Sequence, residues 1–68
     1  MKIVYSKRGM AVTYATGEYA EYDNMQAAIY DGVSDTFIII WDDGDVHERE
    51  IDDYFLVQSL DNGDIIEF

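Results

Sequence analysis

Short apolar segments alternate with glycine-containing turns along this chain of 68 residues, and no proline, internal repeat or low-complexity stretch interrupts them. Turn signals recur about every 8–12 residues, a spacing typical of short antiparallel strands. Asp43-Gly44 and Asn62-Gly63 are residue pairs that two-residue β-hairpin turns favour. The sequence therefore predicts a single all-β or β-rich domain over residues 1–68, built as a small antiparallel sheet or barrel.

Apolar and β-branched residues mark where the strands are expected. Met10, Val12 and Tyr14 share one face of the second strand, because side chains alternate along a strand. Residues 36–41 (TFIIIW) are the most hydrophobic run, and we expect them to form the central strand, buried on both faces. The expected strands cover residues 2–6, 10–15, 36–41, 46–51, the part of 51–60 that follows a short turn, and 65–68.

Residues 18–31 fit both a strand and a helix. Thr16 can cap a helix that ends at Gly32, and Ala, Glu, Gln and Met favour helix, but two glutamates fall on its apolar stripe. As a strand, residues 25–31 direct one set of side chains inward (Met25, Ala27, Ile29) and the other outward (Gln26, Ala28, Tyr30). We favour the strand; the alternative is an α+β fold with one helix near residues 18–31.

The charge is strongly negative and unevenly distributed. Fifteen Asp and Glu against four Lys and Arg give a net charge of −11. Lys2, Lys7 and Arg8 are the only charged side chains before Glu18. Phosphate binding depends on Lys and Arg, so we expect no direct contact with nucleic acid or with a membrane. The charge favours a basic protein surface as partner.

The chain also lacks the marks of export. No apolar stretch near its start resembles a signal peptide, and residues 37–41 are too short a run to cross a bilayer. No cysteine is present, which fits a reducing compartment. The expected location is the cytoplasm, that of the host cell if a phage encodes the protein.

Patterns that support catalysis or metal binding are missing. Asp42, Asp43, Asp45 and Glu48 suggest a calcium loop, but Gly44 is not at the position that an EF-hand requires. His47 is the sole histidine, and no triad or phosphate-binding loop accompanies it. We expect no catalytic residue, no cofactor, no metal and no enzyme activity.

Carboxylates concentrate between residues 42 and 53. If the return strand continues through this segment, Glu48, Glu50 and Asp52 share one face at steps of about 6.6–6.8 Å. Phosphates along DNA have a similar several-ångström spacing, so such a row can occupy a phosphate-binding groove. The predicted partner-binding residues are Asp42, Asp43, Asp45, Glu48, Glu50, Asp52 and Asp53. A second acidic row is expected from Glu18, Glu21, Asp23, Asp31 and Asp35.

In size, charge and lack of other chemistry, the chain resembles the small acidic DNA-mimic inhibitors of phages and mobile elements, of anti-CRISPR and anti-restriction type. The resemblance implies a non-enzymatic inhibitor that occupies the nucleic-acid-binding surface of a nuclease or of a CRISPR or restriction-type defence complex. Self-repulsion of the charge destabilises a small domain, which favours a functional reason for keeping it. An acidic subunit of a larger complex is an alternative.

Residues 25–57 resemble the last strands of SH3-like or Tudor-like barrels. The matching features are Ala28-Ile29, the strand Phe37–Trp41, the Asp43-Gly44 turn, and an acidic return strand that ends in one helical turn over Glu50–Tyr54. The resemblance implies a small SH3-like barrel. It also implies, as an alternative function, a reader of basic or methylated peptides through cation–π contacts with an aromatic cage of Tyr22, Tyr30, Trp41 and Tyr54.

The final segment, residues 64–68 (DIIEF), is a candidate edge strand. Edge strands present unpaired backbone groups, so this one is able to pair with a second copy and form a homodimer.

Overall fold

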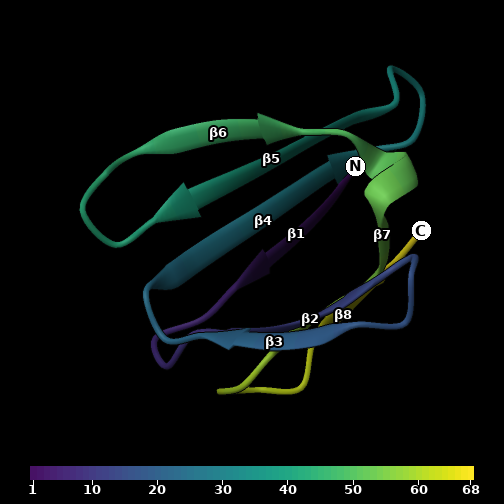
Figure 1. Cartoon of the computed structure of the whole chain (residues 1–68). Coiled ribbons are helices and arrows are strands. Elements are labelled where there is room, and N and C mark those ends of the chain that lie inside the picture. The colour runs from purple at the N-terminus through teal and green to yellow at the C-terminus, as the bar shows by residue number, and fades with distance from the viewer.

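Eight β-strands and one 3₁₀ turn, with no α-helix, make up this computed structural model, which describes residues 1–68 (Figure 1). Two four-stranded antiparallel sheets result: sheet A in the order β1-β4-β5-β6 and sheet B in the order β3-β2-β7-β8. The predicted β-rich class is confirmed, and no closed barrel is formed. The elements are β1 (Lys2–Tyr5), β2 (Met10–Tyr14), β3 (Tyr19–Tyr22), β4 (Met25–Asp31), β5 (Thr36–Trp41), β6 (Val46–Arg49), the turn η1 (Ile51–Asp53), β7 (Tyr54–Ser59) and β8 (Ile65–Glu67).

The α+β alternative is wrong, because residues 18–31 form β3 and β4. Thr16 and Gly17 make the β2–β3 turn instead of a helix cap: the Glu18 amide lies 3.4 Å from Thr16 Oγ1, and Gly17 has a φ of 93°. Pairing of β3 with β2 supplies the backbone hydrogen bonds that a helix would otherwise have made. Tertiary pairing therefore outweighs the helix propensity of the segment.

An irregularity in β4 reverses the predicted direction of its side chains. Met25 pairs with Trp41 and Ala27 with Ile40, so Gln26 is an extra residue on the β4 side. After this bulge Ala28, which is fully buried, faces the core, while Ile29 faces outward. The prediction that Ala27 and Ile29 point inward and Ala28 outward is wrong for this reason.

The core lies between the two sheets. Its nine buried residues come from both of them: Val4, Met10, Val12, Met25, Ala28, Phe37, Ile39, Val57 and Ile66. The shared inward face predicted for Met10, Val12 and Tyr14 is confirmed, with Tyr14 packed at the margin of this core. On one side β1 lies against β7 and β8; on the other, β3 and β6 are the free edges of their sheets (Figure 1).

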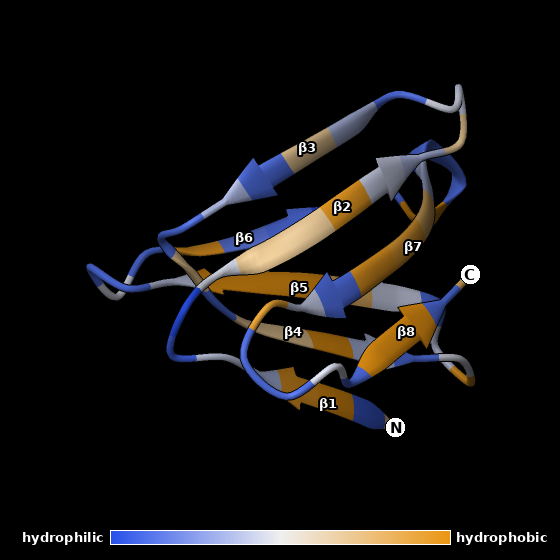
Figure 2. Cartoon of the chain, turned by 90° about the horizontal axis from the view of Figure 1, so that it is seen from below, coloured by the Kyte–Doolittle hydropathy of each residue, from blue (hydrophilic) through white to orange (hydrophobic).

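Only one face of β5 is covered by the other sheet. Phe37 and Ile39 are buried in the core, whereas Ile38 and Ile40 lie on the outer face of sheet A and are half-buried by their neighbours in the sheet. The prediction that this strand is buried on both faces is therefore wrong for its outer face. Figure 2 shows the hydrophobic colour along β5 and on parts of β1 and β4.

The return strand is shorter than expected. β6 ends at Arg49, Glu50 remains extended, and Ile51–Asp53 turn as a 3₁₀ helix, where the single helical turn was predicted. The Asp53 carbonyl then accepts a hydrogen bond of 2.9 Å from the Ala15 amide, which joins the turn to the end of β2. The structure contains no helix with the length and apolar character that a membrane span requires.

Candidate functional site: an aromatic groove with acidic ends

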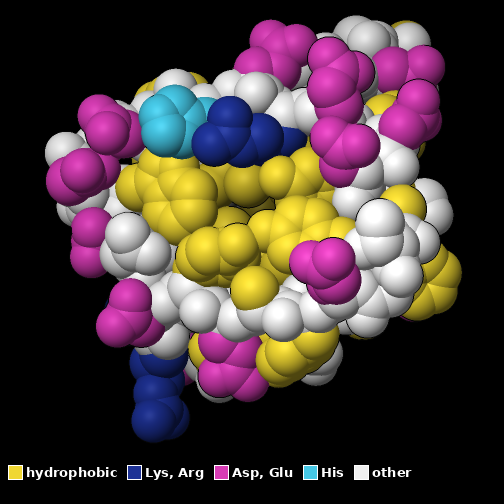
Figure 3. Space-filling view, in the orientation of Figure 1, with side chains coloured by type: hydrophobic (Ala, Val, Ile, Leu, Met, Phe, Trp, Pro, Cys, Tyr) yellow, Lys and Arg dark blue, Asp and Glu magenta, His cyan; other side chains and the backbone are white.

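A groove opens where the two sheets part, between the edge strands β3 and β6. Figure 3 shows it as a hollow of hydrophobic side chains with His and Arg on one rim and Asp and Glu around it. The central cavity has a volume of about 160 Å³. Its walls are four aromatic side chains together with Met25, Ile39 and Arg49; the aromatic ones are Tyr14, Tyr22, Trp41 and Tyr54.

Contacts between these aromatic residues fix the walls. The hydroxyls of Tyr14 and Tyr22 are hydrogen-bonded at 2.6 Å. The rings of Tyr22 and Trp41 meet edge to face with centroids 5.8 Å apart, and those of Tyr14 and Tyr54 are 5.4 Å apart. Burial and the hydrogen bond with Tyr22 raise the pKa of Tyr14 to about 12.

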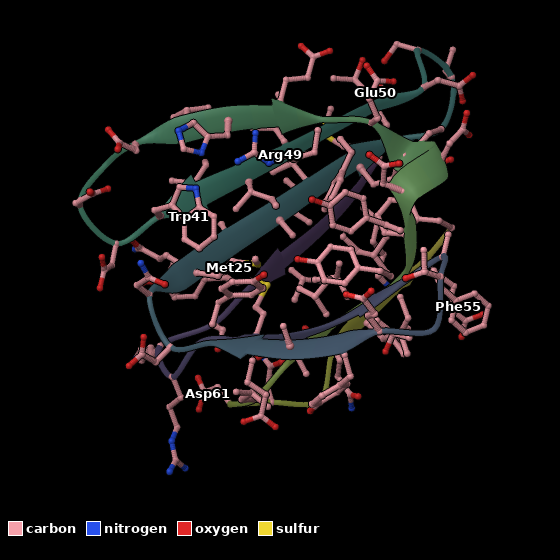
Figure 4. The ribbon with its side chains drawn as sticks, in the orientation of Figure 1. Met25, Trp41, Arg49, Glu50, Phe55 and Asp61 are labelled. Atoms are coloured by element: carbon pink, nitrogen blue, oxygen red, sulfur yellow. The ribbon has the colours of Figure 1, made fainter.

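One rim carries a histidine and an arginine from β6. The indole N–H of Trp41 lies 2.9 Å from Nδ1 of His47, and Nη2 of Arg49 lies 3.2 Å from the same nitrogen. Because an indole N–H can only donate, Nδ1 is the acceptor and carries no hydrogen in this arrangement. Figure 4 shows Trp41, Arg49 and Met25 in the space between β6 and β3, while Phe55 points away from it.

Carboxylates occupy both ends of the groove. At one end, Tyr14 and Tyr54 also line a second hollow of about 510 Å³ with Glu18, Asp52 and Asp53. At the other end, Tyr22 and Trp41 also line a third hollow of about 360 Å³, whose acidic residues are Asp43 and Asp45. The three hollows are neighbours, because each outer one shares two aromatic walls with the central cavity. The groove therefore has an aromatic middle and two negatively charged ends.

Three of the four predicted cage residues meet in this groove: Tyr22, Trp41 and Tyr54. Tyr30 does not, because it packs edge to face against Phe68 at a centroid distance of 5.1 Å and borders a hollow with Lys2. Tyr14 takes its place in the groove. The inward alternation of Met10, Val12 and Tyr14 was the signal in the sequence that could have identified it.

The seven predicted partner-binding carboxylates are all exposed, but they do not form one row. Glu48 lies in β6, whereas Glu50 precedes η1 and Asp52 lies within it. The regular strand spacing predicted for these three is wrong, because the strand ends at Arg49. The structure distributes the seven between the groove ends (Asp43, Asp45, Asp52, Asp53) and positions outside the hollows that form the groove (Asp42, Glu48, Glu50).

The second predicted row is divided between the two sheets. Glu18, Glu21 and Asp23 lie in or beside β3 of sheet B, whereas Asp31 ends β4 of sheet A and Asp35 lies in the following turn. The Val33 amide donates a 3.0 Å hydrogen bond to Asp31 Oδ1, which lowers the pKa of that carboxyl. Only Glu18 of this set lines the groove.

No group of three or more His, Cys, Asp or Glu side chains is arranged to hold a metal ion. Comparisons with protein-family models, with curated proteins and with solved structures gave no match for this chain.

Proposed function

We propose that this protein is a non-catalytic binding protein that takes a cationic segment of a partner protein into the groove between β3 and β6. One observation carries the proposal: an aromatic middle, formed by residues of both sheets, is flanked at each end by a hollow bordered by carboxylates. Neither part alone would specify the charge and the shape of the ligand.

The chemistry of the walls matches Lys and Arg side chains. A cation over an aromatic face is attracted by the ring quadrupole, by about 0.5–2 kcal/mol depending on desolvation. The alkyl stems of Lys and Arg bury well against apolar surface while their charged heads reach polar groups. Carboxylates at both ends attract further cations of an extended segment, and the net charge of −11 accelerates the encounter.

Arg49 shows how a guanidinium fits against this wall. Its side chain lines the central cavity, contacts His47 and lowers the pKa of Tyr54 relative to the value that burial alone would give. A cation from a partner must share this space with Arg49 or displace it. Loss of the Arg49 charge should therefore strengthen binding of a cationic ligand, whereas loss of an aromatic wall should weaken it.

A nonaarginine peptide tests the proposal by isothermal titration calorimetry. Tyr22→Ala should weaken binding about tenfold, which corresponds to about 1.4 kcal/mol. Tyr19→Ala is the matched control, since Tyr19 belongs to the same strand but is exposed on its outer face. Arg49→Gln should strengthen binding. If Tyr22→Ala does not fold, Trp41→Leu is the second groove variant and should also weaken binding. Wild-type affinity in both Tyr22→Ala and Trp41→Leu would show that the groove is not the site.

A DNA-mimic inhibitor is the second candidate, and the exposure of all seven carboxylates from Asp42 to Asp53 favours it. In this case the charges outside the groove contact the nucleic-acid-binding surface of a nuclease or defence complex. Inhibition of a panel of nucleases with cationic DNA-binding surfaces provides the assay. Combined reversal of Asp42, Glu48 and Glu50 to Lys should abolish inhibition, and Tyr22→Ala should leave it intact; the opposite pattern favours the groove.

A further inference from the structure

We propose that a second copy of this chain covers the outer face of sheet A, in a face-to-face dimer whose two-fold axis runs parallel to the strands. This surface is separate from the groove, which lies between the inner faces of the two sheets. The inference therefore does not depend on the identity of the groove ligand.

The outer face of sheet A is apolar across all four strands. Residues that pair directly in antiparallel strands lie on the same face, so the register defines one short polar pair, Asp31–Thr36, at one end of β4 and β5, and two rows that cross all four strands. Seven of the eight side chains in these rows are apolar, and only Glu48, at the β6 edge, is charged. The rows are Ile3–Ile29–Ile38–Glu48 and Tyr5–Ala27–Ile40–Val46.

Several of these side chains remain open to solvent. Ile3 is 58% exposed, Tyr5 49% and Val46 59%, and no other element of the chain covers them. Ile38 and Ile40, in the middle of the face, are half-buried only by their neighbours. A contiguous apolar patch of this kind on a soluble domain marks an interaction surface.

Sheet B provides an internal comparison, because its outer face is mixed. Both of its rows contain a carboxylate and further polar groups, as expected where one face of an antiparallel sheet meets water. These rows are Glu21–Ala11–Gln58–Ile65 and Tyr19–Thr13–Leu56–Glu67. The apolar outer face is therefore a property of sheet A and not of this fold in general.

Charge complementarity selects a second copy as the occupant. The β1 edge is followed by the exposed Lys7 and Arg8, whereas the β6 edge carries Glu48 on its outer face and is preceded by the exposed Asp43 and Asp45. A two-fold axis parallel to the strands places β1 of each copy over β6 of the other, so basic and acidic edges meet. An axis across the strands would place β6 over β6 and oppose like charges.

The same axis matches the apolar rows. It reverses the order of strands while keeping their length direction, so Ile29 of one copy lies over Ile38 of the other. Two sheets of equal width and twist pack at about 10 Å in this way. This packing gives a physical reason for the isoleucines on the outer face of β5, because they then belong to a core shared by two chains.

Sedimentation equilibrium of the full chain over a range of concentrations tests the dimer. We expect a mass of two 7.8 kDa chains, retained in 1 M NaCl because apolar burial does not require unscreened charge. Ile38→Lys should give a monomer. Leu56→Lys is the matched control, a half-buried outward residue of the inner strand β7 in sheet B, and should remain dimeric. A wild-type monomer at all concentrations up to about 1 mM overturns the proposal.

Cross-linking determines the axis and does not depend on the fold of Ile38→Lys. The chain has no cysteine, so Ile3→Cys and Glu48→Cys each introduce a single thiol. A short bis-maleimide should join the two variants when they are mixed and neither variant to itself. Self-linking of Ile3→Cys, or no product in the mixture, contradicts the arrangement. A negative cross-linking result does not affect the proposed binding of cationic peptides, because the groove lies on the opposite face of sheet A. The two interactions also differ in salt dependence, since only peptide binding should weaken with salt.

Discussion

The indole N–H of Trp41 donates a hydrogen bond of 2.9 Å to Nδ1 of His47, across the hairpin that joins β5 to β6. This contact orients the only tryptophan of the chain toward Tyr22 and so forms one wall of the groove. The apolar run of β5 and the acidic segment after it therefore meet at a defined point. The run provides the inner wall, and the turn and return strand provide the charged end.

Removal of the acceptor should release Trp41. His47→Ala leaves the half-buried indole N–H without its partner, at a cost of about 1 kcal/mol in the free energy of unfolding, and shifts the tryptophan emission. His47→Asn keeps an acceptor oxygen near the position of Nδ1 and should lose less. Urea denaturation followed by fluorescence gives both quantities, and equal losses in the two variants would show that the hydrogen bond is not what stabilises this corner.

Gly9 should be far less tolerant of substitution than Gly17, although both have positive φ angles of 97° and 93°. A Cβ on Gly9 would overlap the Tyr22 carbonyl oxygen and lie 2.6 Å from Asp23 Cα, whereas nothing approaches a Cβ on Gly17. Gly17→Ala should cost about 1 kcal/mol from backbone strain, and Gly9→Ala about 3 kcal/mol or more. Thermal melts of the two variants provide the comparison, and similar melting temperatures would contradict the close packing of this turn.

Alkaline pH should destabilise the fold through the groove tyrosines. Burial raises the pKa of Tyr54, and burial with the Tyr22 hydrogen bond raises that of Tyr14 to about 12, above the value of about 10 in an unfolded chain. A raised pKa stabilises the fold below pH 10, and this contribution is lost as the pH rises toward 12. Tyr14→Phe should make the melting temperature fall less steeply over this range; an unchanged slope would mean that Tyr14 does not contribute.

Strands and turns were the predictable part of the fold. Glycine-containing turns and β-branched runs located most of the strands, and the single helical turn after the acidic strand was also expected. The bulge at Gln26 was not predictable, since it depends on the register between β4 and β5. Barrel closure likewise depends on pairing between edge strands that are far apart in the sequence. The sequence alone therefore did not distinguish two open sheets from a closed barrel.

The candidate site was predictable in its chemistry but not in its geometry. Three of the four proposed cage residues meet in the groove, yet Tyr30 and Tyr14 exchange roles because the two sheets part at the β3 and β6 edges. The proposed acidic row failed at Glu50, where the chain leaves the strand for the 3₁₀ turn. Alternation along a sequence predicts the direction of a side chain only for as long as the strand continues.

The most direct test compares two proteins of equal charge by the change in Trp41 fluorescence on titration with nonaarginine. One carries Asp43→Asn and Asp53→Asn, at opposite ends of the groove; the other carries Asp61→Asn and Asp64→Asn, in the β7–β8 turn. Figure 4 shows Asp61 outside the groove, beyond sheet B. Binding through the groove predicts that the first pair weakens affinity about three- to tenfold at low salt, while the second leaves it nearly unchanged. Equal weakening by both pairs would contradict binding through the groove, because the affinity of the peptide would then depend only on the net charge of the protein.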